Sequence, residues 1–250
     1  MLMIPGFLGI PYDFRWSVLW ESPHGQWILN VLLNTIKIGA VSWIFAILLG
    51  ILFGALRTSP FRPLRAIATA YVEFFRNVPL LVWLFFWYFG APEVFPEGIR
   101  QWLIHHGMEF WSGVAGISVY HGARMAEIIR AGIQSIPKTQ TEAGLSSGLS
   151  IFETYRFIII PIALRLIVPP LTNDSLGLLK NTSLAMTIGV AELTFATRQI
   201  ETYTAKAFEA FTAGTLIYLV LCLSISFVLN RMESRFAIPG LIARTERPEH

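Results

Sequence analysis

Residues 28–56 read ILNVLLNTIKIGAVSWIFAILLGILFGAL, and this stretch decides the fold class. Its strongly polar side chains, Asn30, Asn34 and Lys37, lie near one end. An α-helix needs about 20 mostly apolar residues to cross the hydrocarbon core of a bilayer. The stretch exceeds that length and therefore predicts a membrane-spanning helix.

The composition of the whole chain agrees with a helical membrane protein. Of its 250 residues, 54% are hydrophobic and 14% are charged, whereas about a quarter of the residues of a soluble domain are charged. The net charge of +3 could also suit a nucleic-acid-binding protein. Such proteins gather Lys and Arg on one face, but here these residues are scattered among apolar runs. We therefore expect a lipid bilayer as the environment and no nucleic acid as a partner.

Four further apolar segments predict spans at residues 66–89, 110–133, 164–184 and 211–229. The segment 66–89 contains Pro79, and the segment 164–184 contains Pro169 and Pro170, where we expect helix breaks that free backbone groups. The predicted fold is an all-α membrane protein with about five transmembrane helices. This odd number places the two termini on opposite sides of the membrane.

Lys and Arg between the spans predict the orientation, because cytoplasmic loops are enriched in them. One side would hold Arg57, Arg62, Arg65, Arg130, Lys138, Arg156, Arg165, Arg231, Arg235, Arg244 and Arg247. The other side would hold Arg15, Arg100, Arg198 and Lys206. The N-terminus is thus expected outside and the C-terminus inside. We expect an external segment at residues 1–26 without a cleavable signal peptide, a transmembrane domain at 27–235 and a cytoplasmic tail at 236–250.

The cytoplasmic loop at residues 136–161 reads IPKTQTEAGLSSGLSIFETYRFIIIP. It is too polar at its start to be a span, and its pattern predicts two short helices joined by a turn. If residues 141–149 are helical, small residues form a stripe that lets another surface come close. The members of this stripe are Ala143, Gly144, Ser147 and Gly148. The pattern alone fits an ordinary amphipathic loop helix equally well.

The same loop resembles the EAA loop of ABC importer permeases. The matching positions are Glu142, Ala143, Gly144, Gly148, Ile158, Ile160 and Pro161. Gly144 replaces the second Ala of the motif, and Ile160 replaces its Leu. The resemblance implies the type I ABC importer permease fold, and it implies that these residues dock on a cytoplasmic ABC ATPase dimer. It also implies a second permease subunit, a periplasmic amino-acid-binding protein and a multi-pass position in the bacterial inner membrane.

Other segments resemble the polar amino-acid permeases within that family. They are YVEFFRNVPLL at residues 71–81, AGIQS at 131–135, VPP at 168–170 and LLKNTSLAMTIGVAEL at 178–193. The combination is most similar to the permeases of glutamate/aspartate importers. The cargo implied by this resemblance is glutamate or aspartate.

Charged residues inside the predicted spans are candidates for the substrate path, because a charge at the bilayer centre costs about 2.5 to 3.5 kcal/mol. Arg76 and Lys180 could bind the carboxylates of an acidic amino acid, and Asp174 could bind its ammonium. Neighbouring polar residues complete the candidate set: Asn77, Asn173, Asn181 and Thr182. The alternative is that these side chains hold helices together.

Ion pairing along one helix is the alternative for the charged residues of two spans. Glu73 and Arg76 are three residues apart, and so are Arg124, Glu127 and Arg130 in series. Residues at this spacing are neighbours on a helix surface. We therefore also expect a Glu73–Arg76 pair and a ladder from Arg124 through Glu127 to Arg130.

Several other functions lack their motifs. The chain has no GxxxxGK[ST] loop, so ATP and Mg must be bound by a partner ATPase and this chain has no cofactor of its own. No nucleophile–base arrangement and no metal-ligand spacing is visible, so we expect neither catalytic residues nor a metal site. The alternative function is a secondary amino-acid transporter or a channel-like membrane protein.

Overall fold

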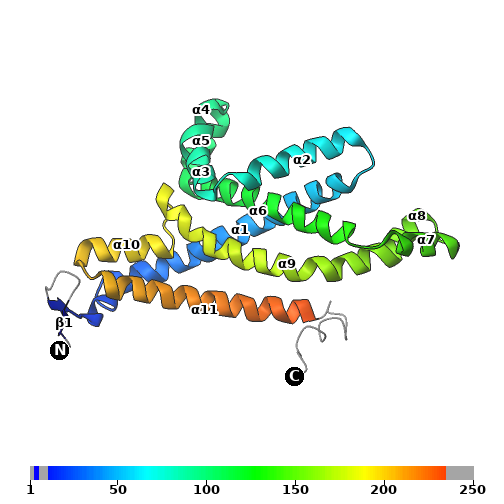
Figure 1. Ribbon diagram of the computed structural model, residues 1–250. Coiled ribbons are helices and arrows are strands. Elements are labelled where there is room, and N and C mark those ends of the chain that lie inside the picture. Colours follow the sequence, from blue (N-terminus) through cyan, green and yellow to red (C-terminus); the bar gives the residue numbers. More distant parts are fainter. Residues whose placement is uncertain (1–2, 6–10, 235–250) are drawn as a thin grey trace, which may run out of the picture. The chain divides into compact units, whose positions relative to one another are not determined.

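The computed structural model describes residues 3–5 and 11–234, most of which are helical (Figure 1). The expected tail at 236–250 lies outside the described residues. Two short antiparallel strands, β1 (Met3–Pro5) and β2 (Pro11–Asp13), and a 3₁₀ turn, η1 (Trp16–Leu19), precede the helices. The prediction of an all-α chain is therefore right except for this small hairpin.

Long helices occupy four of the five predicted spans. They are α1 (His24–Thr58), α6 (Met108–Gln134), α9 (Ile160–Asn181) and α11 (Ala207–Ser234). The shorter elements outside the loop 136–161 are α2 (Arg62–Asn77), α3 (Leu80–Phe85), the π-helical turn η2 (Phe86–Gly90), α4 (Ala91–Val94), α5 (Glu97–His106), the 3₁₀ segment η4 (Thr182–Ile188) and α10 (Leu193–Thr204).

The second predicted span, residues 66–89, is not one straight helix. Helix α2 ends at Asn77 and α3 begins at Leu80, and the segment bends by 102° at this break. Pro79 has no backbone N–H and forces the residue before it out of the helical region. Val78 accordingly has the extended angles φ −102° and ψ 135°. The break expected at Pro79 is confirmed.

The break expected at Pro169 and Pro170 is wrong, because α9 continues through both residues. Their missing N–H groups cannot bond the carbonyls of Arg165 and Leu166 one turn earlier. Both of those residues are exposed, and a helix can tolerate proline where other groups satisfy the freed carbonyls.

Among the described residues, two helices are long and apolar enough by themselves to cross a membrane. They are α1 and residues Ala207–Arg231 of α11. The bent pair formed by α2 and residues Leu80–Val94 would add a third span. Helices α6 and α9 carry more polar residues, and the number of spans stays a prediction.

The chain forms two compact units. The first contains the described parts of residues 1–42, 79–117 and 178–223, and the second those of 43–78, 118–177 and 224–250. In the second unit, α1 and α6 approach closely at two glycines. A Cβ on Gly50 would lie 2.7 Å from Cβ of Met125, and one on Gly54 would lie 2.9 Å from Cβ of Ile129. Glycine at these positions lets the two helix backbones come together.

In the first unit, polar contacts hold the N-terminal hairpin against the start of α11. The carboxylate of Glu209, which is fully buried, accepts hydrogen bonds from the hydroxyl of Tyr12 at 2.5 Å and the backbone N–H of Arg15 at 2.6 Å. Lys206 donates to the backbone carbonyl of Asp13. A buried carboxylate with two donors is satisfied, so these contacts fix the hairpin in place.

Candidate functional site

The loop 136–161 folds as two short helices joined by a turn, as predicted. They are α7 (Lys138–Ser146) and α8 (Ile151–Thr154), and α8 continues through a π-helical turn, η3 (Tyr155–Ile159), into α9 (Figure 1). The prediction of a helix over 141–149 is wrong at its end, because Gly148 has φ +85° and stops α7. The N–H groups of Gly148 and Leu149 donate to the carbonyls of Leu145 and Gly144, which is the Schellman arrangement for a helix C-terminus.

Gly144 packs inside the loop and does not join an exposed stripe with Ala143. It is buried, whereas Ala143 is exposed. A Cβ on Gly144 would lie 2.7 Å from Cγ2 and 2.9 Å from Oγ1 of Thr154, and 3.1 Å from Cδ1 of Ile158. The close approach that this glycine permits is therefore between α7 and the segment α8–η3. The expectation of one stripe formed by residues 143, 144, 147 and 148 is wrong, because the helix ends before its last members.

A capping box begins α8. The Ser150 hydroxyl accepts from the N–H of Glu153, and the Glu153 carboxylate accepts from the N–H and the hydroxyl of Ser150. The hydrogen bond from the Ser150 side chain, followed by that from its backbone, holds the pKa of Glu153 below its ordinary value. The Ser-x-x-Glu spacing is a sequence signal for this motif, and our reading of the sequence missed it.

The surface of the loop combines an acidic residue with apolar side chains. Glu142 is exposed. Large apolar side chains are exposed as well: Leu145, Ile151, Phe152, Tyr155, Phe157 and Ile160. Phe152 is 70% exposed. Exposed apolar groups that gather in one segment mark a surface for a protein partner or a membrane. Of the predicted docking residues, Ile158 and Pro161 are only partly exposed.

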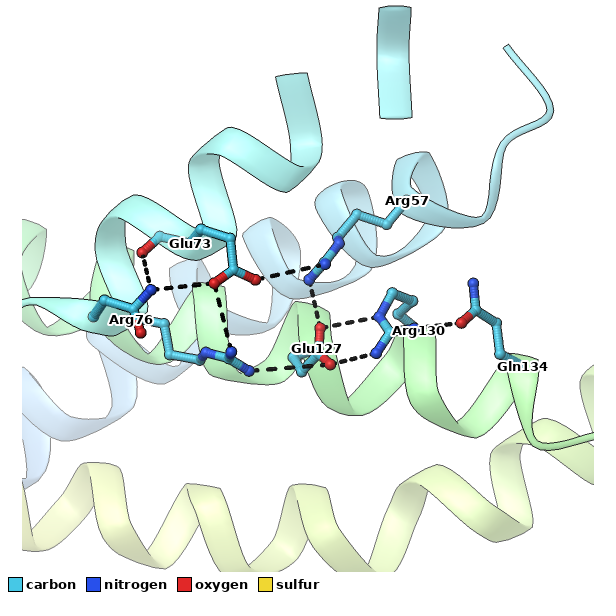
Figure 2. Close-up of polar contacts among 7 residues, drawn as sticks. Arg57, Glu73, Arg76, Glu127, Arg130 and Gln134 are labelled. Atoms are coloured by element: carbon cyan, nitrogen blue, oxygen red, sulfur yellow. Dashed lines mark hydrogen bonds and ion pairs between the residues drawn. The ribbon is translucent and has the colours of Figure 1, made fainter. Parts of the chain in front are cut away.

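A charged cluster joins α1, α2 and α6 within the second unit (Figure 2). The Glu127 carboxylate accepts hydrogen bonds from Arg57 and Arg130. Nη2 of Arg76 lies 3.7 Å from Oε2 of Glu73, and its Nη1 lies 4.0 Å from Oε1 of Glu127. Nη2 of Arg57 lies 3.7 Å from Oε1 of Glu73. The expected Glu73–Arg76 pair is confirmed. Three guanidinium groups thus share two carboxylates.

Asn77 belongs to the same neighbourhood. Its side-chain amide donates to the backbone carbonyl of Glu73 at 2.7 Å and to the Glu73 carboxylate at 3.1 Å. Both contacts are made within α2, one turn apart. The amide therefore supports the end of α2, just before the break at Pro79.

A second cluster forms around Asp174 in α9. One oxygen of its buried carboxylate lies 2.9 Å from Nδ1 of His121, and the other accepts a 2.6 Å hydrogen bond from Nε of Arg124. The expected ladder is therefore wrong at Arg124, which pairs with α9, whereas its Glu127–Arg130 step is confirmed. We assigned no partner to His121 from the sequence and missed its contact with Asp174. No local signal identifies a partner 53 positions away.

The remaining predicted path residues are distributed over both units. Asn173 is exposed in the second unit, beside Asp174. Lys180 is exposed in the last turn of α9, in the first unit, and Asn181 follows it with partial burial. Thr182 is fully buried, and its hydroxyl donates to the carbonyl of Leu179. The structure thus joins Arg76 to Asn77 through Glu73, and it keeps Asp174 in a separate contact group.

The described part of the chain holds no group of three or more His, Cys, Asp or Glu side chains that could bind a metal ion. The His106 ring stacks on the Trp102 ring, with centroids 4.6 Å apart. Nδ1 of His106 lies 2.8 Å from the backbone carbonyl oxygen of Trp102.

Comparison with known proteins decides the family. Residues 46–238 match the family described as the binding-protein-dependent transport system inner membrane component. The chain belongs to this family. It is an amino-acid ABC importer permease, and it is 38% identical over 238 residues to the glutamate/aspartate import permease protein GltJ of Escherichia coli K12. That match covers 91% of this permease and 97% of GltJ.

Permeases named for other substrates are also similar. The glutamine transport system permease protein GlnP of Escherichia coli K12 is 35% identical, over 90% of this permease and 99% of its own length. The crystal structure of an amino acid ABC transporter with histidines matches with a TM-score of 0.76 and 30% identity, covering 90% of this permease and 100% of that chain. The methionine transporter MetNI, with a TM-score of 0.71 and 17% identity, shows the shared fold.

Proposed function

We propose that this permease carries glutamate or aspartate across the bacterial inner membrane. It acts as one of two permease subunits, which are related chains or copies of this chain. An external binding protein delivers the amino acid, and a cytoplasmic ATPase dimer binds ATP and Mg. The similarity to GltJ supports the acidic cargo, and the 35% identity to GlnP makes glutamine the competing one.

The exposed surface of the loop 136–161 is the observation that carries the ATPase-docking role. It presents Glu142 for polar contacts and Phe152 and its apolar neighbours for burial. Aromatic anchors and a few charged groups are the features that dominate protein interfaces. Inside the loop, Gly144 against Thr154 and the Ser150–Glu153 capping box keep this surface in one shape.

Charge reversal tests the docking role. We expect Glu142→Arg to uncouple ATP hydrolysis from uptake in reconstituted vesicles while the chain stays inserted. Glu97→Arg is the matched control, because Glu97 is an exposed glutamate of α5 outside the loop. Wild-type ATP-driven uptake by the Glu142→Arg variant would overturn the docking assignment.

The proposed topology has five spans, with the N-terminus outside and the loop 136–161 and the C-terminus inside. It rests on the distribution of Lys and Arg. A Phe152→Cys variant in a Cys222→Ser background tests it with a membrane-impermeant thiol reagent. We expect labelling in inside-out vesicles and none in intact spheroplasts, and the opposite pattern would reverse the topology.

The proposed substrate path contains Arg76, Asn77, Asn173, Asp174, Lys180, Asn181 and Thr182. The ion pairs of Arg76 give it a second duty in holding α2 to α6. We expect Arg76→Ala to lower glutamate uptake. If the variant assembles in the wild-type amount, the loss of uptake reports the role in the substrate path, whereas a smaller amount of complex reports the structural role. Wild-type uptake by this variant would leave Arg76 with the structural duty alone.

The cargo is tested with the purified complex in vesicles. We expect the binding protein loaded with glutamate or aspartate to stimulate ATPase activity and the glutamine-loaded form to stimulate it much less. Strong stimulation by glutamine alone would assign the permease to glutamine. Uptake without ATP would favour the alternative, a secondary transporter.

A further inference from the structure

Arg124 stands out among the residues of α6. From Met108 to Arg130, each of the other residues of this helix is buried or partly buried, and Arg124 is exposed. Its side chain is 45% exposed, whereas those of Asp174 and His121 are 2% exposed. Between residues 108 and 130, the exposed position of α6 is therefore occupied by a cation.

The position of Arg124 along α6 makes this exposure costly in a lipid environment. At a rise of 1.5 Å per residue, it lies about 24 Å from the first residue of α6 and about 15 Å from the last. If α6 spans the bilayer, this depth falls within a hydrocarbon core about 30 Å thick. A charged side chain at such a depth faces a protein partner or a watery path.

The contacts of Arg124 hold its guanidinium in place, and the ion pair with Asp174 uses its inner nitrogen. Asp174 accepts from Nε at 2.6 Å, and the Arg124 guanidinium carbon lies 5.9 Å from the centre of the Tyr120 ring. His121 holds the other oxygen of Asp174. This ion pair does not use Nη1 and Nη2, and these two nitrogens form the edge that binds a carboxylate with two parallel hydrogen bonds.

The same contacts argue against Asp174 as the acceptor for a substrate ammonium group. Both of its carboxylate oxygens already have partners, and the carboxylate is buried. Arg76 lies within ion-pair distance of two carboxylates, those of Glu73 and Glu127, whereas Arg124 pairs with that of Asp174.

We propose that Arg124 binds a carboxylate of the acidic amino acid on its way through this permease, and that Asp174 and His121 are positioning residues that fix its guanidinium. The inference deepens the proposed function and rests on the acidic cargo. It names a specificity-determining residue that helical spacing alone assigned to an ion-pair ladder.

The test uses the complete importer containing the full chain, reconstituted in vesicles. Two rates are compared: uptake of radiolabelled glutamate, and ATPase activity stimulated by the glutamate-loaded binding protein. We expect Arg124→Gln to lower uptake at least tenfold with ATPase stimulation within twofold of wild type. Arg65→Gln, the same change at an exposed arginine of α2, should leave both rates within twofold.

Two further variants keep the test decisive. Arg124→Lys keeps the charge but lacks the planar fork, so we expect a several-fold loss of uptake with normal ATPase stimulation. Asp174→Asn weakens the contact that holds Nε, and it should lower uptake in the same selective way. If Arg124→Gln does not assemble, Arg124→Lys decides.

Three outcomes would overturn the inference. Wild-type glutamate uptake by Arg124→Gln, or by Arg124→Lys where the Gln variant does not assemble, removes the anion-binding role. Equal losses of uptake and ATPase stimulation in both Arg124 variants assign the residue to structure alone. A wild-type complex that carries neither glutamate nor aspartate overturns the proposed cargo and this inference together, and the wild-type measurement by itself identifies that case.

Discussion

Glu127 in α6 accepts a hydrogen bond from Arg57, which lies 70 positions earlier in the last turn of α1 (Figure 2). Their side chains are 24% and 11% exposed, so the contact is partly shielded from solvent. The same carboxylate also binds Arg130 and lies near Arg76. One residue of α6 therefore connects the ends of α1 and α2.

We expect Glu127→Gln to destabilise the permease by about 2 kcal/mol, because hydrogen bonds to charged groups contribute roughly 1.5 to 3 kcal/mol. The change leaves Arg57, Arg76 and Arg130 with the carboxylate of Glu73 alone. Thermal unfolding of the purified complex, followed by intrinsic fluorescence, measures the effect.

Glu97→Gln is the control, because Glu97 pairs with Arg100 on the surface at 61% and 43% side-chain exposure. Such exposed ion pairs contribute little to stability, so the unfolding midpoint of the Glu97→Gln variant should stay at the wild-type value. Equal unfolding midpoints for the two variants would show that the cluster around Glu127 stabilises the permease no more than a surface ion pair does.

Gly144→Ala restores the alanine of the EAA motif, and we expect it to destabilise the loop in this permease. The new Cβ would lie 2.7 Å from Cγ2 of Thr154, closer than side chains tolerate without a shift. Thr154→Ala removes the two nearest atoms. A double-mutant cycle on ATPase affinity should therefore give a coupling energy of roughly 0.5 to 3 kcal/mol. Additive effects would mean that the loop relaxes freely around the methyl group.

Gly148→Ala should cost roughly 1 to 2 kcal/mol, because φ +85° lies in the left-handed region that L-residues disfavour. Asn tolerates this region, so Gly148→Asn should retain most of the stability. Hydrogen exchange of the α7 amides provides the measurement. Gly98→Ala in α5, where a Cβ meets no atom within 4 Å, serves as the control. Equal exchange rates in the Ala and Asn variants would refute the backbone explanation.

Acidification should loosen the start of α8. The pKa of Glu153 is lowered by its hydrogen bonds with Ser150, so the carboxylate stabilises the fold above the ordinary glutamate pKa. This contribution is lost as the pH falls through the lowered pKa. Hydrogen-exchange protection of α8, corrected for intrinsic rates, should fall over that interval in wild type.

Glu153→Gln should show the weaker protection at neutral pH already and should lose the acid-dependent step. A variant that keeps the wild-type pH profile would assign that step to another group.

Long apolar runs, motif spacing and proline chemistry predicted helix α1, the loop 136–161 and the break at Pro79. The apolar run at 28–56 predicted α1, and Pro79 predicted a break, because both depend on residues adjacent in the chain. The motif from Glu142 to Pro161 resembles the EAA loop and so predicted the family that the comparisons show. Local signals also existed where our prediction failed, as at Ser150 and Glu153, whose spacing announces a capping box.

The tertiary structure decided the partners of the charges. Three-residue spacing made Glu127 the natural partner of Arg124, but Asp174 binds Arg124 from 50 positions away. The tertiary structure also places Gly144 against Thr154, inside the loop. The sequence by itself predicted the long helices and the two-helix loop, because these follow from short-range geometry, and the resemblance of its motifs indicated the family. Which helix faces meet depends on packing between distant segments, and only the tertiary structure determined that Arg124 is the exposed cation of α6.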